Sequence, residues 1–366
     1  MNVFALVTDA FGGFGGIAQY NRALLTALAQ CVDGGHIVVL PRFGHADQSE
    51  LPPAVRQLKA RGSKLGYSIG AFCAAVAEGP FDVVFCGHLH MAPLGAIIAR
   101  FLRVPLWLQL HGIEAWNSMT RTQRWGAGHA SLITAVSRHT RRRFLRFDGG
   151  DPARVRVLPN VVDNRFAAGP RPDHLLERHH LRGKRILLTV GRLAADERRK
   201  GHDTVIRALP AIIKACPDLV YLIAGKGDDE IRLAALAQQH GVENEVLFVG
   251  MVEQDELADY YRLADVFVMP STQEGFGIVF LEAAASGLKV IGGNGDGSTD
   301  ALADGVIGFT IDPANSDELI LAISQALAGH GPDPAQVQRF NRENFTRQVC
   351  ELTSSHLLCP AVRGTA

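Results

Sequence analysis

Short apolar runs alternate with stretches of helical spacing along nearly the whole chain. In the first half, this pattern predicts strands near residues 3–7, 36–40, 83–86, 105–110, 132–135 and 156–158. In the second half, it predicts strands near residues 185–190, 220–224, 246–249, 266–269, 290–291 and 308–311. Strands that alternate with helices are typical of a doubly wound α/β fold built on parallel sheets.

The two halves of the chain share one plan. Each begins with a strand that leads into a glycine-bearing loop, VFALVTDAFGGFGG in the first half and RILLTVGRL in the second. The length of 366 residues exceeds the range of a single hydrophobic core. We therefore expect two Rossmann-like domains at 1–165 and 184–338, joined by a linker at 166–183. A ligand would lie in the cleft between the domains.

Composition narrows the class of protein. The 37 basic and 37 acidic residues give zero formal net charge, which argues against a nucleic acid as partner. The spacing of the six cysteines predicts neither a disulfide framework nor a zinc site, and it fits a reduced cytoplasm. The start of the chain is unlike a signal peptide, and the longest apolar stretch, 92–110, is interrupted by Arg100, Arg103 and Pro105. We expect a cytoplasmic protein without a transmembrane helix.

The segment EGFGIVFLE follows the apolar run 266–269 and carries two carboxylates, Glu274 and Glu282. Gly275 and Gly277 lie between the end of this predicted strand and the start of a predicted helix, where parallel sheets bind ligands. The two carboxylates could reach opposite ends of one elongated, hydroxyl-rich ligand. The alternative is that Glu274 only favours the start of the helix and that Glu282 is a solvated helical residue.

A glycine-rich loop at 9–16, DAFGGFGG, precedes a predicted helix at 17–29 and permits the close approach of an anion. Residues 13–18 also match the dinucleotide pattern G-x-G-x-x-A. A nicotinamide site would need an acidic residue at the end of the second strand, where this chain has Pro41 and Arg42.

In the second half, GRLAADERRKG places Arg192 just after a strand and Lys200 just before a helix. Both cations could converge on a diphosphate and neutralise it without a mandatory metal. The alternative is a solvated basic loop, to which Arg198 and Arg199 also belong.

Three histidines and one basic helix are further candidates. His111 follows a predicted strand and is interpreted as a hydrogen-bonding partner of substrate hydroxyls. His88 and His90 lack a third metal ligand and are interpreted as cleft-edge or structural residues. The run 137–147, SRHTRRRFLRF, is either a solvated helix face or a contact to phosphorylated lipid or an anionic membrane.

Together these motifs resemble glycosyltransferase family 4, the retaining GT-B enzymes, over nearly the whole chain. The element E-x7-E with its internal Gly-Phe-Gly is the most specific part of this resemblance. The other matching positions are Gly15-Gly16, His111-Gly112, Ser137, Pro159-Asn160 with Asp163, and Arg192 with Lys200.

The resemblance implies a role for each matching residue. Arg192, Lys200, Glu274 and His111 would form the catalytic set, in which the two cations bind the donor diphosphate. The donor would also contact Gly15, Gly16, Val252, Gly275, Phe276, Gly277, Ile278 and Glu282, of which Glu282 holds the ribose and Val252 lies against the base. Arg138, Asn160 and Glu114 would lie on the acceptor side. The resemblance implies neither a cofactor nor a metal.

The expected reaction is transfer of a hexose, with retention, from a UDP- or GDP-linked sugar to an acceptor sugar or lipid-linked saccharide. This would serve bacterial polysaccharide or glycolipid synthesis, with peripheral contact to the inner face of the plasma membrane. The alternatives are a nucleotide-sugar epimerase that uses His111 and Glu114, and a catalytically silent nucleotide-sugar binder.

Three segments extend or depart from the family pattern. The charged stretch LAADERR leaves open whether Arg198 or Arg199 replaces Lys200. The run GGNGDGSTD offers Asp296 as an additional sugar contact. Residues 339–366 resemble the terminal helix that crosses back onto the first domain in this fold.

Overall fold

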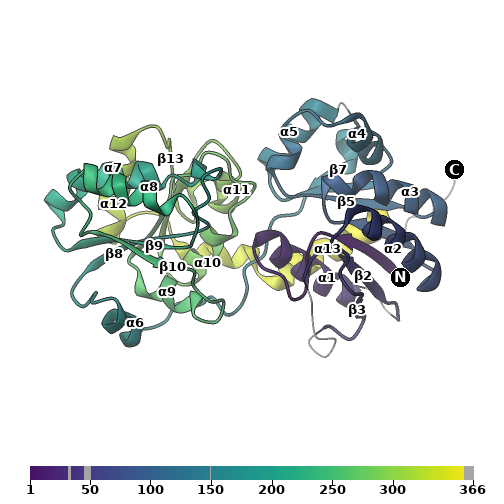
Figure 1. Cartoon of the computed structure of the whole chain (residues 1–366), viewed down its shortest axis with the longest axis horizontal. Coiled ribbons are helices and arrows are strands. Elements are labelled where there is room, and N and C mark those ends of the chain that lie inside the picture. Colours follow the sequence, from purple (N-terminus) through teal and green to yellow (C-terminus); the bar gives the residue numbers. More distant parts are fainter. Residues whose placement is uncertain (32–33, 45–50, 149, 358–366) are drawn as a thin grey trace. The chain divides into compact units, whose positions relative to one another are not determined.

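The computed structural model describes residues 1–31, 34–44, 51–148 and 150–357, which form two compact units (Figure 1). Unit 1 comprises Met1–Val161 and Arg342–Ala366, and unit 2 comprises Val162–Asn341. Residues 166–183, which the sequence analysis assigns to a linker, carry the short helix α6 (Asp173–Arg178) and are grouped with unit 2.

In the described part of unit 1, seven parallel strands form one sheet in the order β3-β2-β1-β4-β5-β6-β7. The central strands are buried on both faces, as expected of a parallel sheet covered by helices on either side. The strands are β1 (Val3–Val7), β2 (Ile37–Pro41), β3 (Val55–Gln57), β4 (Val83–Cys86), β5 (Leu106–Leu110), β6 (Leu132–Ala135) and β7 (Val155–Val157). The helices are α1 (Gly16–Cys31), α2 (Lys64–Ala77), α3 (Ala92–Leu102), α4 (Arg121–Gly128), α5 (Arg138–Asp148) and α13 (Arg342–His356), with 3-10 turns η2 (Leu89–Met91), η3 (Ile113–Ala115) and η4 (Pro152–Arg154).

In the described part of unit 2, six parallel strands follow the order β10-β9-β8-β11-β12-β13. They are β8 (Arg185–Val190), β9 (Leu219–Ala224), β10 (Val246–Gly250), β11 (Val266–Met269), β12 (Lys289–Gly293) and β13 (Phe309–Ile311). The helices after α6 are α7 (His202–Ala215), α8 (Glu230–Gln239), α9 (Leu257–Leu263), α10 (Ile278–Ala285), α11 (Ser298–Ala301) and α12 (Ser316–Leu327), with 3-10 turns η5 (Arg198–Lys200), η6 (Ala303–Gly305) and η7 (Pro334–Phe340).

The predicted doubly wound parallel-sheet fold is confirmed, and five predicted strands, namely β1, β4, β6, β8 and β11, have the observed bounds. The edge strand β3 was not predicted. Its sequence, Val-Arg-Gln, is short, and only its first and third side chains are buried, so it gives too weak an apolar signal to be recognised.

The cysteine spacing predicted no disulfide framework, but Cys31 and Cys350 form a disulfide. The two residues are 319 positions apart, and only the fold reveals that α13 packs against α1 within unit 1. The same two helices also meet through the ring of Phe345 from α13, which lies edge-on to that of Tyr20 from α1 with 6.0 Å between ring centroids. The disulfide therefore fixes the last helix of the chain to the first.

Among the described residues, no helix is both long and apolar enough to cross a bilayer.

Candidate functional site

The loops of unit 2 that carry the predicted donor residues follow adjacent strands. β9 and β10 follow one another on one side of β8, and the next strand, β11, lies on the other side of β8. The ends of β8 and β11 thus flank the point at which the strand order reverses, which is where open parallel sheets bind ligands. The loop after β8 carries Arg192 and Lys200, and the loop after β11 carries Glu274.

Lys200 and Glu274 meet at this point, with 2.9 Å between Nζ and Oε1. Both side chains are about four-fifths buried, since 20% of Lys200 and 18% of Glu274 is exposed. The stem of Lys200 runs across Gly191, where a Cβ atom would lie 3.0 Å from the lysine Cδ. Gly201, which directly follows Lys200, has a φ of 84°, and a Cβ there would lie 2.4 Å from the carbonyl oxygen of Pro270. The backbone therefore requires a glycine at position 201, whereas Gly191 leaves room for the lysine stem.

The loop that carries Glu274 is held by the buried carboxylate of Asp296. Its Oδ2 accepts hydrogen bonds from the backbone N–H of Glu274, at 2.6 Å, and from the hydroxyl of Ser271, at 3.2 Å. Its Oδ1 accepts a bond from the N–H of Ser298. Burial raises the pKa of Asp296, although the hydrogen bonds to its charged form act in the opposite direction. The sequence suggested Asp296 only as a sugar contact, whereas the structure shows that it orders the loop itself.

The helix α10 starts directly after this loop. Gly277 precedes its first residue, Ile278, with a φ of 84°, and a Cβ there would lie 2.5 Å from the ring of Phe280. Phe276 is buried. Glu282 is also buried, and its Oε2 accepts a hydrogen bond from the Tyr261 hydroxyl at 2.8 Å. The interpretation of Glu282 as a solvated helical residue is therefore wrong.

Two other predicted donor residues of unit 2, Arg192 and Val252, lie apart from the Lys200–Glu274 pair. Arg192 is 78% exposed and forms an ion pair with Glu197 of its own loop. Val252 is partly buried and follows β10, which is separated from β8 by β9. Within the described part of the chain, no hydrogen bond or ion pair joins either residue to the Lys200–Glu274 pair.

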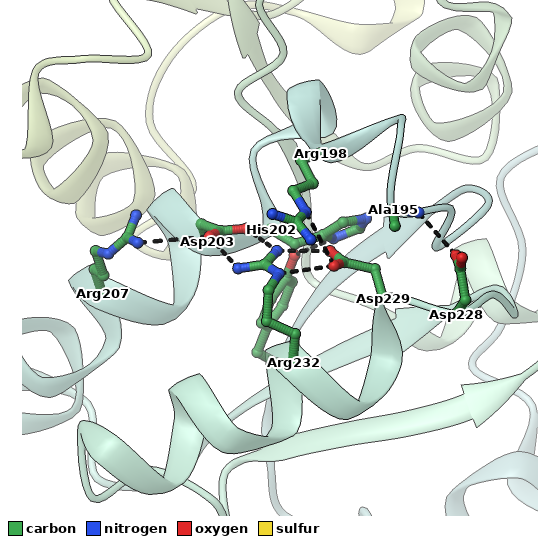
Figure 2. A network of polar contacts seen from close by, with 9 residues as sticks. Ala195, Arg198, His202, Asp203, Arg207, Asp228, Asp229 and Arg232 are labelled. Carbon is green, nitrogen blue, oxygen red and sulfur yellow. Dashed lines mark hydrogen bonds and ion pairs between the residues drawn. The ribbon is translucent and has the colours of Figure 1, made fainter.

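A network of ion pairs lies next to the loop of Lys200 (Figure 2). At its centre is Arg232 of α8, whose guanidinium contacts both oxygens of Asp203 at 2.7 and 2.8 Å and both oxygens of Asp229 at 2.7 and 2.6 Å. Arg198 of η5 donates a further bond to Asp229. Hydrogen bonds from Arg232 hold the pKa of both aspartates below the ordinary value of 3.8.

This network ties three segments to one another. Asp203 belongs to the first turn of α7, Asp229 lies just before α8, and Arg198 belongs to the turn that ends at Lys200. Two backbone N–H groups reinforce it, because that of Asp229 donates to Leu193 and that of Ala195 donates to Asp228. No sequence pattern indicates Arg232, because its partners Asp203 and Asp229 are 29 and 3 residues away and match no short motif.

In unit 1, the glycine-rich loop follows β1 and leads into α1 at Gly16, directly after Gly15, which has a φ of 88°. Two side chains of α1 fix this loop by hydrogen bonds to its backbone carbonyl oxygens. The Asn21 amide donates to the carbonyl oxygen of Asp9 at 2.8 Å, and Arg22 donates to the carbonyl oxygens of Ala10 and Gly13. Sequence reasoning missed both, although their place in the first turns of the helix fits this role.

His111 lies at the end of β5, as predicted, and its ring is fixed on two sides. One ring nitrogen, Nε2, is 2.9 Å from the carbonyl oxygen of Gly87, and the ring lies edge-on to that of Tyr20. Its backbone N–H donates to Glu114 at 2.5 Å, so this carboxylate is used within the loop. Burial lowers the pKa of His111 and that of His88, the latter to about 4.

His88 and His90 are engaged in local hydrogen bonds. The Nδ1 atom of His88 accepts a bond from the backbone N–H of His90, and the Nδ1 of His90 is 2.7 Å from the amide of Gln123. Across the described ranges, no group of three or more His, Cys, Asp or Glu residues is arranged to hold a metal ion.

The predicted acceptor-side residues occupy two further loops of unit 1. Ser137 caps α5 by accepting a bond from the N–H of Thr140, and Arg138 is the exposed first residue of that helix. Asn160 is buried near the end of this unit's first segment.

Comparison with known proteins gives consistent matches. The model of the family described as glycosyl transferases group 1 matches residues 175–344, and that of glycosyltransferase family 4 matches residues 14–166. A GDP-mannose-dependent alpha-(1-6)-phosphatidylinositol monomannoside mannosyltransferase of Mycolicibacterium smegmatis is 34% identical over 269 residues, or 69% of each chain. A glycogen synthase of Mycobacterium tuberculosis is 28% identical and covers 96% of this chain and 92% of its own. The crystal structure of HepE from Anabaena in complex with UDP and glucose superposes with a TM-score of 0.78 at 23% identity, covering 97% of this chain and 100% of that one.

Proposed function

The chain belongs to glycosyltransferase family 4 and has the GT-B fold, and we propose that it transfers a hexose from a UDP- or GDP-hexose to an acceptor hydroxyl. That the chain is a glycosyltransferase using a nucleotide sugar follows from its family. The proposal adds the hexose, retention of the anomeric configuration, and an acceptor that is a sugar or a lipid-linked saccharide. The phosphatidylinositol monomannoside named for the mycobacterial relative is an acceptor of this kind.

One observation carries the proposal, namely the contact between Lys200 and Glu274 where the order of strands reverses. A nucleoside diphosphate sugar has negative charge on its diphosphate and hydroxyl donors on its hexose. A cation and a carboxylate 2.9 Å apart match these two neighbouring parts of one ligand. A bound donor would replace the ion pair, with its diphosphate on Lys200 and its sugar hydroxyls on Glu274.

The remaining donor contacts follow from the same placement. Arg192, which is exposed, would turn from Glu197 to the diphosphate. The N–H groups of Gly275, Phe276 and Gly277 precede α10, where partial positive charge favours oxygen ligands. Glu282 would exchange the Tyr261 hydroxyl for the ribose hydroxyls.

We propose that the leaving diphosphate itself accepts the proton of the attacking hydroxyl. The glycosidic bond to the diphosphate breaks ahead of attack, and the acceptor oxygen forms the new bond on the same face of the sugar. Charge on the leaving diphosphate is stabilised by Lys200 and Arg192, so that the protein acts by electrostatics and positioning. No carboxylate is needed as a nucleophile, and Glu274 serves to bind and orient the sugar.

In unit 1, we propose that Gly15 and Gly16 offer backbone N–H groups to the donor and that His111 binds a hydroxyl of the hexose. The lowered pKa of His111 keeps its ring neutral near pH 7, which suits a hydrogen-bonding role. Arg138 and Asn160 would serve the acceptor.

An epimerase of the same fold is less well supported, because it would need Glu114 or His111 as an acid or base. The Glu114 carboxylate already accepts a hydrogen bond from the backbone N–H of His111. A silent binder would contain the same donor site, so only a measurement of turnover separates it from an enzyme.

Transfer from UDP-glucose and GDP-mannose to simple glycoside and lipid-linked acceptors tests the proposal, with the anomeric configuration of the product read by NMR. We expect turnover with one nucleotide and a product that keeps the donor configuration. An inverted product would contradict the mechanism. Release of an isomerised nucleotide sugar without acceptor would identify an epimerase, and donor binding without turnover a silent binder.

A further inference from the structure

The helices α2 and α3 of unit 1 are neighbours (Figure 1). Both expose large apolar side chains. On α2, Leu65, Ile69 and Val76 are 73%, 55% and 68% exposed. On α3, Ile97 and Phe101 are 45% and 59% exposed. An exposed apolar side chain is common by itself, but several on adjacent helices mark a surface that contacts something else.

The spacing of these side chains makes the surface continuous. Positions 65, 69, 72 and 76 recur at i, i+4, i+7 and i+11, which places them on one line along α2. The partly buried Phe72 joins this line to α3, because its ring centroid is 6.1 Å from that of Phe101. The α2–α3 face is defined here by six residues: Leu65, Ile69, Phe72, Val76, Ile97 and Phe101.

The other side of α2 already supplies the core. Tyr67, Ala71, Ala74 and Ala75 are buried in the same cluster that contains Phe4 of the sheet. The helix is therefore apolar on its outer side in addition to its packed side, and of the outer residues only Phe72 also packs against this core.

Charge around the face has one sign. Residues 51–77 and 91–113 contain no aspartate or glutamate. Apart from Arg56, which pairs with Glu78, the cations of these two ranges are exposed and form no ion pair within the described part of the chain. These cations are Lys59, Arg61, Lys64, Arg100 and Arg103.

We propose that the α2–α3 face docks onto an anionic lipid bilayer. Apolar side chains flanked by cations match the boundary of such a bilayer, where the acyl chains accept the former and the phosphates attract the latter. The long stems of Lys and Arg allow their charges to reach the headgroups while the apolar residues insert. The docked enzyme would lie at the surface where a lipid-linked acceptor is embedded.

Charge complementarity favours this occupant over a second copy of the chain. Two α2–α3 faces in contact would bring Lys64, Arg100 and Arg103 of each copy together. The acidic residue that directly follows α2, Glu78, already pairs with Arg56 and does not offset this repulsion.

The arginine-rich helix α5 is a weaker membrane candidate than the sequence suggested, because two of its guanidinium groups are used within unit 1. Arg141 donates to the carbonyl oxygens of Val155, at 2.7 Å, and Pro152, at 3.0 Å. Arg143 donates to that of Trp116. Three arginines of α5 are exposed, Arg138, Arg142 and Arg146, but the described part of this helix exposes no large apolar residue beside them.

Sedimentation of the full-length protein with vesicles tests the proposal without donor or acceptor, so that the result is independent of the proposed transfer reaction. We expect wild type to bind phosphatidylcholine vesicles containing phosphatidylglycerol, and to bind much more weakly to phosphatidylcholine alone or in high salt. Ile69→Gln with Phe101→Gln should reduce the partition coefficient at least about tenfold. Arg100→Gln with Arg103→Gln should reduce it to a similar extent.

Two matched controls separate this face from apolar or basic surface in general. Ile231→Gln with Leu321→Gln removes two exposed apolar residues from unit 2, and Arg142→Gln with Arg146→Gln removes two exposed arginines from α5. Both should bind vesicles like wild type. Equal losses in the controls, or unchanged binding in the α2–α3 variants, would overturn the proposal.

A second measurement does not depend on these variants. Cys73 is an exposed free cysteine on α2 and can carry an environment-sensitive fluorophore in a chain with Cys216→Ser and Cys359→Ser. We expect a blue shift on adding anionic vesicles. An unshifted spectrum, or sedimentation equilibrium showing a dimer that Ile69→Gln with Phe101→Gln converts to a monomer, would reject the bilayer as the occupant.

Discussion

At the residue scale, three successive cations, Arg198, Arg199 and Lys200, are candidates to bind the proposed donor diphosphate. The structure separates them, because Lys200 contacts Glu274, Arg198 contacts Asp229, and Arg199 contributes its backbone carbonyl to the N–H of Thr272. The order of residues in LAADERR does not indicate which of these three side chains faces Glu274. Only the turn η5 and the glycine that follows it decide which side chain faces the loop after β11.

We therefore predict that Lys200→Ala and Glu274→Ala each reduce transfer at least about a hundredfold, the scale seen when one preorganised charge or donor is removed. Arg198→Ala should cost about tenfold or less, since Arg198 acts only through Asp229. Initial rates at saturating donor check this order. Near-normal turnover in Lys200→Ala, or a larger loss in Arg198→Ala, would contradict the assignment of Lys200.

At the element scale, Arg232 of α8 positions the loop of Lys200 without lying in it. Arg232→Met would remove four contacts and leave the carboxylates of Asp203 and Asp229 close together without their cation. We predict a rise in the donor KM and a fall in kcat/KM of about tenfold or more, with a smaller change in kcat. Arg232→Lys should recover only part of the loss, because a lysine cannot form both bidentate contacts.

Arg207→Met is the matched control for Arg232→Met. Arg207 also contacts Asp203, but through a single 3.5 Å contact from a side chain that is 53% exposed. Its loss should leave the donor KM unchanged. Equal effects of the two substitutions would show that general charge near α7, rather than the network of Figure 2, controls the loop.

The disulfide between α1 and α13 makes a separate prediction. Because it closes a loop of 319 residues, its loss should increase the entropy of the unfolded chain and lower the free energy of unfolding by about 2–5 kcal/mol. Cys350→Ser should therefore melt earlier than wild type in the absence of reductant, and dithiothreitol should remove the difference. Cys216→Ser is the control. Equal melting of wild type and Cys350→Ser without reductant would contradict the prediction.

The elements also show what the sequence could and could not predict. Buried strands such as β1 and β11 were recognised because each of their residues is apolar and buried. The sequence predicted that Lys200 and Glu274 serve one donor, but their direct contact depends on the pairing of β8 with β11, which only the structure shows. The Arg232 network and the Cys31–Cys350 pair could not be predicted, because their partners meet only after helices pack. No local sequence pattern indicates which helices will pack together.

At the scale of the whole molecule, each unit contains a histidine whose pKa is lowered mainly by burial, and the pH dependence of stability follows. Burial lowers the pKa of His88 in unit 1 and of His202 in unit 2 from 6.5 to about 4. Between these pH values the unfolded chain takes up protons on both rings while the folded chain does not. Stability should therefore decrease as the pH falls from 6.5 to 4, because the unfolded state binds more protons. This loss is separate from that of the Arg232 ion pairs, which begins only near pH 4, where the aspartates of the unfolded chain are protonated.

Urea unfolding at pH 7 and pH 5 measures the predicted slope, of which His202 alone should account for a loss on the order of 2 kcal/mol at pH 5. His202→Gln removes one titrating ring, so the difference between the two pH values should shrink by that amount, whatever the substitution does to stability at pH 7. His330→Gln, at an exposed position, should keep the wild-type slope. Because Nε2 of His202 has no hydrogen-bond partner in the described structure, protonation of both ring nitrogens would leave a buried N–H without an acceptor. An unchanged slope in His202→Gln would mean that this ring is already protonated in the folded protein or that its side chain reaches solvent.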